Sequence, residues 1–180
     1  MKSPRLKSEV DCPRAVQNMQ VSEMPPAPDR NISVSELEVS FSREISHVTR
    51  MKATYPYKFL ATNISDAIYS VVFLLGFGGG AVAGDCQQLK VKLNENATLI
   101  LRTQGSTKIF KSVDGKFYSQ HVVVELLNGS LLAFIPDPTT CFKGSKYNQH
   151  QIYDLQETAR FAAIQIFLFY VLGVDILFDL

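Results

Sequence analysis

The sequence predicts an all-β fold built from short strands. Segments in which apolar and polar residues alternate follow one another from Val34 onward, and turn-forming residues separate them at intervals of about 8–12 residues. Almost no segment has the 3.6-residue periodicity of an amphipathic helix. The length of 180 residues and the hydrophobic content of 46% are sufficient for one domain with its own core.

Three extended segments are predicted before the glycine-rich stretch. The first runs from Val34 to Ile45, because one of its two sides is largely apolar, as in a half-buried strand. The residues on that side are Leu37, Val39, Phe41 and Ile45. The second is Tyr55–Leu60, with Pro56 at an edge or a bend. The third, Ile68–Leu75, is nearly continuously apolar and is predicted to be covered on both faces.

Five further strands are predicted after the glycine-rich stretch. They are Cys86–Leu93, Thr98–Thr103, Thr107–Ser112, Phe117–Leu127 and Ser130–Ile135. Asp114-Gly115 and Asn128-Gly129 each separate alternating runs. Such pairs are strong signals for a two-residue hairpin turn, in which both central residues need positive φ. No sequence repeat of 20–50 residues indicates a named solenoid.

Composition limits both the partners and the compartment. The net charge is +1 and no long basic segment occurs, so nucleic-acid binding has no electrostatic support. Residues 1–32 are polar and rich in proline, and we expect a disordered tail there because little apolar surface is available for burial. The three cysteines form no disulfide framework, and no signal peptide is recognised, so a cytoplasmic, reducing compartment is expected.

The stretch from Gly76 to Asp85 resembles a phosphate-binding loop, since a G-x-G-x-x-A pattern follows a strand. A dinucleotide site also needs a helix after the glycines, because the helix amino end holds the pyrophosphate. The next residues, Cys86–Leu93, alternate as a strand does. We therefore interpret the glycines as a strand-to-strand junction that needs positive φ and close backbone approach. Asp85 is interpreted as a capping carboxylate or a residue that faces a partner.

Candidates for catalysis and for a stable metal site are weak. No H-x-H or H-E-x-x-H pair occurs among His47, His121 and His150, and no G-x-S-x-G nucleophile elbow is present. Asp137, Cys141 and His150 lie in one segment and could in principle meet a divalent metal, although their spacing matches no closed zinc pattern. The sequence therefore indicates a protein that is not an enzyme, with no stably bound cofactor.

Four stretches together resemble the UreD family of urease accessory proteins, called UreH in some organisms. They are Tyr55–Leu60, Gly78–Asp85, Thr103–Ser112 and Ile135–Gly144. The combination of GGG-x-x-x-GD with T-Q-x-x-T-K about twenty residues later is more specific than either motif alone. The resemblance covers roughly residues 34–159, and its last stretch is similar to the eukaryotic branch of the family.

The resemblance implies stacked, solenoid-like strands and a scaffold without catalysis that helps to insert nickel into apo-urease. The implied partners are apo-urease, UreF and the GTPase UreG, with nickel handled only transiently. Asp85 is expected to line an internal nickel passage, since weak oxygen ligands suit a cation that must move on. The residues expected to form partner-binding or structural motifs are Tyr55, Pro56, Lys58, Gly78, Gly79, Gly80, Gly84, Thr103, Gln104, Thr107, Lys108, Pro136, Asp137 and Pro138.

The end of the chain departs from the family pattern. A tail at residues 1–32, a UreD-like β domain at 33–159 and a divergent apolar segment at 160–180 are therefore the predicted divisions, with the β domain incomplete relative to the family. The alternative is a membrane-anchored β-domain that uses Phe161–Leu180 as its anchor. About 14 apolar residues precede Asp175, fewer than the roughly 20 of a membrane span, so a membrane role is not expected.

Overall fold

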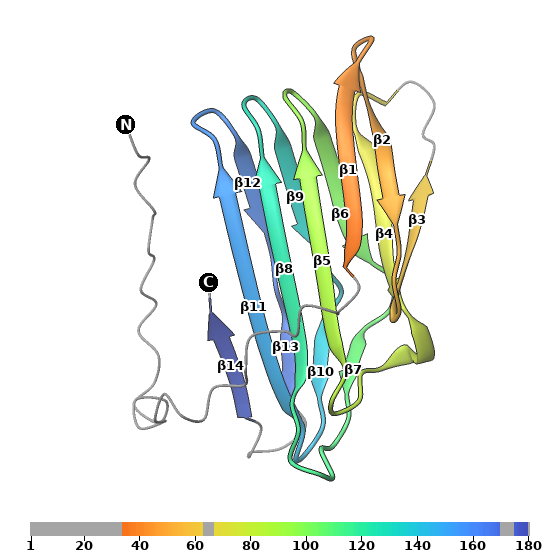
Figure 1. Cartoon of the computed structure of the whole chain (residues 1–180), viewed down its shortest axis with the longest axis vertical. Helices are drawn as coiled ribbons and strands as arrows, with labels where there is room; N and C mark the ends of the chain where they lie inside the picture. Colours follow the sequence, from red (N-terminus) through yellow and green to blue (C-terminus); the bar gives the residue numbers. More distant parts are fainter. Residues whose placement is uncertain (1–33, 63–66, 170–174, 180) are drawn as a thin grey trace.

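The computed structural model describes residues 34–62, 67–169 and 175–179, which form three β-sheets (Figure 1). In sheet A the order is β14 (Asp175–Asp179), β11 (Lys146–Leu155), β8 (Tyr118–Leu126), β5 (Cys86–Leu93), β1 (Ser35–Ser42) and β2 (Ile45–Lys52). In sheet B it is β12 (Arg160–Ala163), β9 (Leu131–Ile135), β6 (Thr98–Thr103), β4 (Ser70–Gly76) and β3 (Tyr57–Thr62). Sheet C contains β13 (Phe167–Phe169), β10 (Thr139–Cys141) and β7 (Thr107–Ile109).

Successive coils of the chain place one strand in each sheet. The strands β5, β6 and β7 form one coil, β8, β9 and β10 the next, and β11, β12 and β13 another. Equivalent strands pair in parallel, so Gln87 lies beside Gln120 and Gln120 beside Gln149. This stacking confirms the predicted all-β, solenoid-like architecture. The register advances by 33 residues from Gln87 to Gln120 and by 29 from Gln120 to Gln149. Residue identity recurs with it, since Tyr118-Ser119-Gln120-His121 returns as Tyr147-Asn148-Gln149-His150. This short repeat was not recognised from the sequence.

Antiparallel strands close one end of the solenoid. The chain reverses at Arg43 and Glu44, which both have positive φ (51° and 64°), and β2 then pairs with β1. The prediction of one strand from Val34 to Ile45 is therefore wrong. Arg-Glu lacks the glycine or asparagine that normally marks such a turn. Beyond Val39 the expected buried face also ends, since Phe41 and Ile45 are exposed. At the same end, β3 pairs antiparallel with β4.

The predicted hairpins at Asp114-Gly115 and Asn128-Gly129 are also wrong. Each pair turns the chain from one sheet to another, because β8 pairs with β5 and β11 rather than with β7 or β9. Only the glycine of each pair has positive φ, 77° at Gly115 and 71° at Gly129. A two-residue hairpin of the expected type needs positive φ at both positions.

Two apolar clusters fill the solenoid. The larger contains inward side chains of sheets A and B, among them Leu37, Val91, Leu99 and Leu132, and the smaller lies near sheet C around Ile109. A fully buried leucine contributes about 1.5–3 kcal/mol, so the larger cluster dominates stability. β4 buries Val72 and Leu74 on one face while the other stays partly exposed, so the expected coverage of both faces is wrong.

Strands continue beyond Ala159 in the structure. β12 and β13 are edge strands of sheets B and C, and β14 is an edge strand of sheet A. In the part of the chain that the structure describes, no helix is long and apolar enough to cross a membrane. The predicted disordered tail, residues 1–32, lies outside the described residues.

Candidate functional site

The glycine-rich stretch forms a corner between the lower ends of β4 and β5, at the lower right of Figure 1. A short 3₁₀ turn, Phe77–Gly79, follows β4, and β5 begins at Cys86, directly after Asp85. No helix follows Asp85, so the arrangement that holds a pyrophosphate is missing. Gly78 and Gly84 have positive φ (73° and 91°), as the sequence predicts for a junction between strands.

Gly80 allows the closest approach in this corner. A Cβ placed on Gly80 would lie 2.3 Å from a ring carbon of Phe110 and 2.9 Å from the carbonyl oxygen of Lys108. The next residue, Ala81, donates its N–H to that same Lys108 carbonyl at 2.7 Å. The glycine corner is thereby joined to β7, and only glycine fits at this crossing.

Hydrogen bonds join the Thr103–Gln104 motif to the Pro136–Pro138 motif. A carboxylate oxygen of Asp137 accepts the Gly105 N–H at 2.8 Å, and the Asp137 N–H donates to Thr103 Oγ1 at 2.6 Å. These contacts connect the β6–β7 corner to the β9–β10 corner of the next coil. Asp137 and Thr103 therefore have a structural reason to be present.

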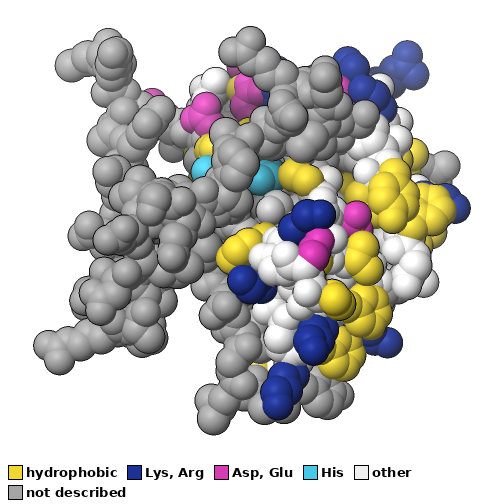
Figure 2. All heavy atoms as spheres, turned by 60° about the horizontal axis from the view of Figure 1, so that its bottom comes forward, with side chains coloured by type: hydrophobic (Ala, Val, Ile, Leu, Met, Phe, Trp, Pro, Cys, Tyr) yellow, Lys and Arg dark blue, Asp and Glu magenta, His cyan; other side chains and the backbone are white. Residues whose placement is uncertain are grey.

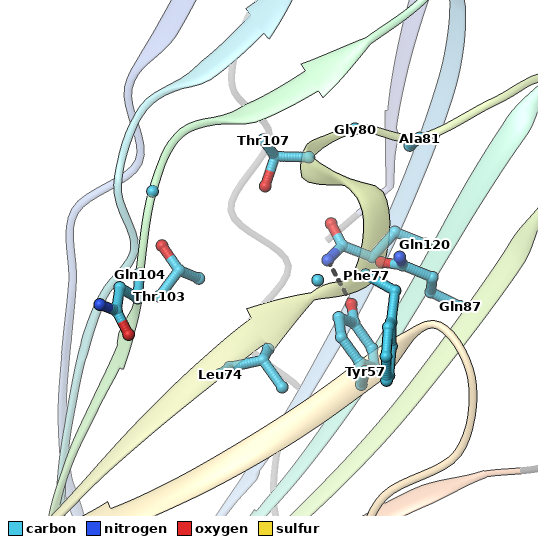
Figure 3. A pocket seen from close by; sticks show the side chains of 12 residues that line it. Tyr57, Leu74, Phe77, Gly80, Ala81, Gln87, Thr103, Gln104, Thr107 and Gln120 are labelled. Carbon is cyan, nitrogen blue, oxygen red and sulfur yellow. Dashed lines mark hydrogen bonds between the residues drawn. The ribbon is translucent and has the colours of Figure 1, made fainter.

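A small cavity of about 70 Å³ lies between the glycine corner and the Thr103–Thr107 corner (Figure 3). Of the predicted motif residues, Gly80, Thr103, Gln104 and Thr107 line it. Sequence reasoning missed three other lining residues, Tyr57, Gln87 and Gln120. Polar residues at the inward positions of strands could have signalled them.

Those three side chains belong to a polar column inside the solenoid. Gln87, Gln120 and Gln149 lie in register on β5, β8 and β11, and Tyr118 stacks on Tyr147 with ring centroids 5.4 Å apart. The Tyr118 hydroxyl donates to Gln87 Oε1. Buried amides and phenols of this kind must be paired, and these are.

Gln120 is the hub of the column. Its Nε2 donates to the Tyr57 hydroxyl at 2.6 Å, while its Oε1 accepts from the Tyr147 hydroxyl at 2.6 Å and from Gln149 Nε2 at 3.2 Å. Burial raises the pKa of Tyr57, Tyr118 and Tyr147 well above the ordinary value of 10.0, so the phenols stay protonated. The column therefore presents neutral oxygen and nitrogen atoms along the interior.

Asp85 is partly buried next to this column. Its carbonyl accepts the Ser119 N–H at 2.9 Å, which places it beside Tyr118 at the start of β8. Burial is the main reason that the pKa of Tyr118 is raised, and the charge of Asp85 adds to it.

The described residues contain no group of three or more His, Cys, Asp or Glu side chains that could hold a metal ion. Asp137, Cys141 and His150, which the sequence left open as a possible group, do not come together, because Cys141 is buried in sheet C while His150 lies on β11 of sheet A.

Exposed aromatic and basic side chains surround the glycine corner. Tyr55 is 72% exposed, and the centroids of its ring and of the Phe77 ring are 6.2 Å apart. The Lys58 ammonium lies 5.1 Å from the Phe77 ring centroid. Figure 2, in which this end comes forward, shows hydrophobic and basic side chains interspersed there. We define the lower face as the exposed residues Tyr55, Lys58, Phe77, Val82, Lys108, Phe110, Lys111, Val113, Lys116 and Lys143.

The lower face carries side chains of the kinds that are common in docking surfaces. Exposed aromatic side chains supply anchors, and lysines supply charge that steers an acidic partner. Tyr55, Lys58 and Lys108 of the predicted motifs lie on it, while Pro56 is buried and Pro136 and Pro138 are partly buried.

Comparison with known proteins supplies the family. The model of the family described as UreD urease accessory protein matches residues 33–170. Urease accessory protein D of Oryza sativa subsp. indica is 32% identical over 125 residues, 68% of this chain and 41% of the rice protein. The Arabidopsis thaliana protein of the same name is 33% identical over 115 residues, 61% of this chain and 38% of its own length. Urease accessory protein UreD of Sorangium cellulosum is 38% identical over 115 residues, 62% of this chain and 36% of its own length.

The chain thus spans about two fifths of the length of the curated relatives it matches. The matched residues nevertheless include all three sheets up to β13. From the extent of this match, the chain belongs to the UreD family of urease accessory proteins.

Proposed function

We propose that this protein acts in urease maturation, as a scaffold without catalysis of its own in the complex that inserts nickel into apo-urease. The family match over residues 33–170 carries the proposal. The proposed partners are apo-urease, UreF and the GTPase UreG, and the proposed compartment is the cytoplasm. GTP hydrolysis belongs to UreG in this scheme, which agrees with a glycine corner that leads into a strand.

The lower face is the proposed docking surface for these partners. Its side chains project from corners of successive coils, which hydrogen bonds such as Asp137–Gly105 hold in place. A rigid surface of this kind loses little conformational freedom on association. Several exposed lysines favour a partner surface that is acidic and partly apolar.

Nickel is cargo in this proposal and is not a resident cofactor. Asp85 is proposed to line its passage, together with the amide and phenol oxygens of the neighbouring polar column. Neutral oxygen ligands hold a borderline divalent cation weakly, which suits transfer rather than storage. Replacing Asp85 with Ala should lower urease activation while leaving the fold intact. Unaltered activation would remove Asp85 from the passage.

The experiment is a pull-down of this chain with apo-urease and UreF, in parallel with urease activation in cells that lack their own UreD. The double charge reversal Lys111→Glu and Lys143→Glu should reduce capture about tenfold, since it removes positive charge from the lower face. The matched control is Arg102→Glu, an exposed charge on β6 outside the lower face. No capture by the unaltered chain would refute the scaffold, and equal losses in both variants would refute the docking surface.

A further inference from the structure

Two histidines lie side by side on the outer face of sheet A. His121 on β8 and His150 on β11 are direct partners in the parallel register, and their ring centroids are 5.8 Å apart at an interplanar angle of 44°. Both side chains are partly exposed, because they alternate with the inward residues Val122, Gln149 and Gln151. The solenoid register brings them together, and each histidine ends a Tyr-x-Gln-His sequence, at 118–121 and at 147–150.

The spacing of the rings fits a shared metal ion. Metal–nitrogen bonds of about 2.0–2.1 Å let two imidazoles on one ion have ring centroids up to roughly 6.5 Å apart. The observed 5.8 Å is within that limit. Parallel strands also hold the two backbones at a fixed separation, so little ordering is needed when the ion binds.

The described neighbour of the pair in sheet A is uncharged. Gln88 of β5 lies in register with His121, on the side opposite to His150, and its amide puts no positive charge beside the two rings.

We propose that His121 and His150 form a surface binding site for one divalent transition-metal ion, held by the two imidazoles and completed by water. Imidazole suits Ni²⁺, Cu²⁺ and Zn²⁺, and the open remaining positions leave the ion exchangeable. The site lies on the outer face of sheet A, away from the lower face and separate from Asp85. It does not depend on the proposed function, because it follows from the strand register alone.

The test is calorimetric titration of the tag-free chain with Ni²⁺, Zn²⁺ and Cu²⁺ separately. One saturable equivalent is expected. His121→Asn and His150→Asn should each weaken metal binding roughly tenfold or more. Each variant leaves one imidazole, so the ion is no longer chelated by two. His47→Asn is the matched control, since His47 lies on β2, and it should bind as the unaltered chain does.

A second measurement keeps the proposal falsifiable if a variant fails to fold. In the unaltered chain, substoichiometric Cu²⁺ should broaden the imidazole ring signals of His121 and His150 in a carbon–proton correlation spectrum before those of His47. Equal broadening of all three, or binding that persists in both the His121 and the His150 variants, would overturn the proposal.

Discussion

Replacing Gln120 with Leu tests the polar column most sharply. Leucine has a similar volume but no polar atoms, so it keeps the packing and removes the hub. Tyr57 and Tyr147 are only 5% and 1% exposed, and their hydroxyls then lose the Gln120 amide as a hydrogen-bond partner. An unsatisfied buried polar group costs about 1–3 kcal/mol, so the expected destabilisation is about 2–6 kcal/mol.

Urea denaturation followed by circular dichroism measures this loss. With a slope of about 1–3 kcal/mol per molar urea, the midpoint should fall by at least about 0.7 M. The matched control is Gln104→Leu, because Gln104 is exposed at the β6–β7 corner, and its effect should stay within about 0.5 kcal/mol. Equal midpoints for the two variants would refute the claim that Gln120 holds the column together.

Three further perturbations follow from the geometry. Gly80→Ala should destabilise the fold by about 1–3 kcal/mol, because the added Cβ would collide with the Phe110 ring and the Lys108 carbonyl oxygen. A Cβ on Gly76 meets nothing within 4 Å, so Gly76→Ala should be tolerated in the same urea assay, and equal effects would contradict the close approach at Gly80. Burial raises the pKa of Tyr153 to about 12 from 10.0, so the stability that this residue contributes is complete below pH 10 and is lost as the pH rises through 12. Ultraviolet titration should show its phenolate half formed near pH 12, and half-ionisation at pH 10 would contradict its burial. Asp137→Ala should lower the free energy of unfolding by about 0.5–1.5 kcal/mol, because the hydrogen bond from the Gly105 N–H is lost. Asp137→Asn keeps an acceptor oxygen and should lower it less. Equal melting temperatures of the two variants in thermal denaturation would mean that this hydrogen bond does not stabilise the fold.

Alternation along the chain predicted most strands but not how they pair. Thr98–Thr103 and Cys86–Leu93 were predicted with the bounds found in the structure, because each buries every second residue against the core. The pairing was wrong at Asn128-Gly129, since a turn between sheets uses the same residue types as a hairpin turn. Parallel stacking depends on contacts about 30 residues apart, which local patterns do not encode.

The candidate site was predictable where glycine or motif spacing marked it and was missed elsewhere. Gly80 and Asp85 stand out in the sequence, and the structure gives each a defined neighbourhood. Gln120 looked like an ordinary polar position in a strand because the repeat of Tyr-x-Gln-His at 118–121 and 147–150 was not recognised. The register with Gln87 and Gln149 shows that it belongs to a column. The reversal at Arg43 and Glu44 carried no sequence signal, because neither residue type favours positive φ.

Amide hydrogen exchange by mass spectrometry tests the central claim, docking through the lower face, most directly. The chain is compared alone and after mixing with apo-urease and UreF. We expect peptides covering Phe77–Asp85 and Phe110–Lys116 to gain protection, while peptides from the outer strand β2 do not change. Complex formation without protection at the glycine corner, or with protection confined to β2, would contradict the account.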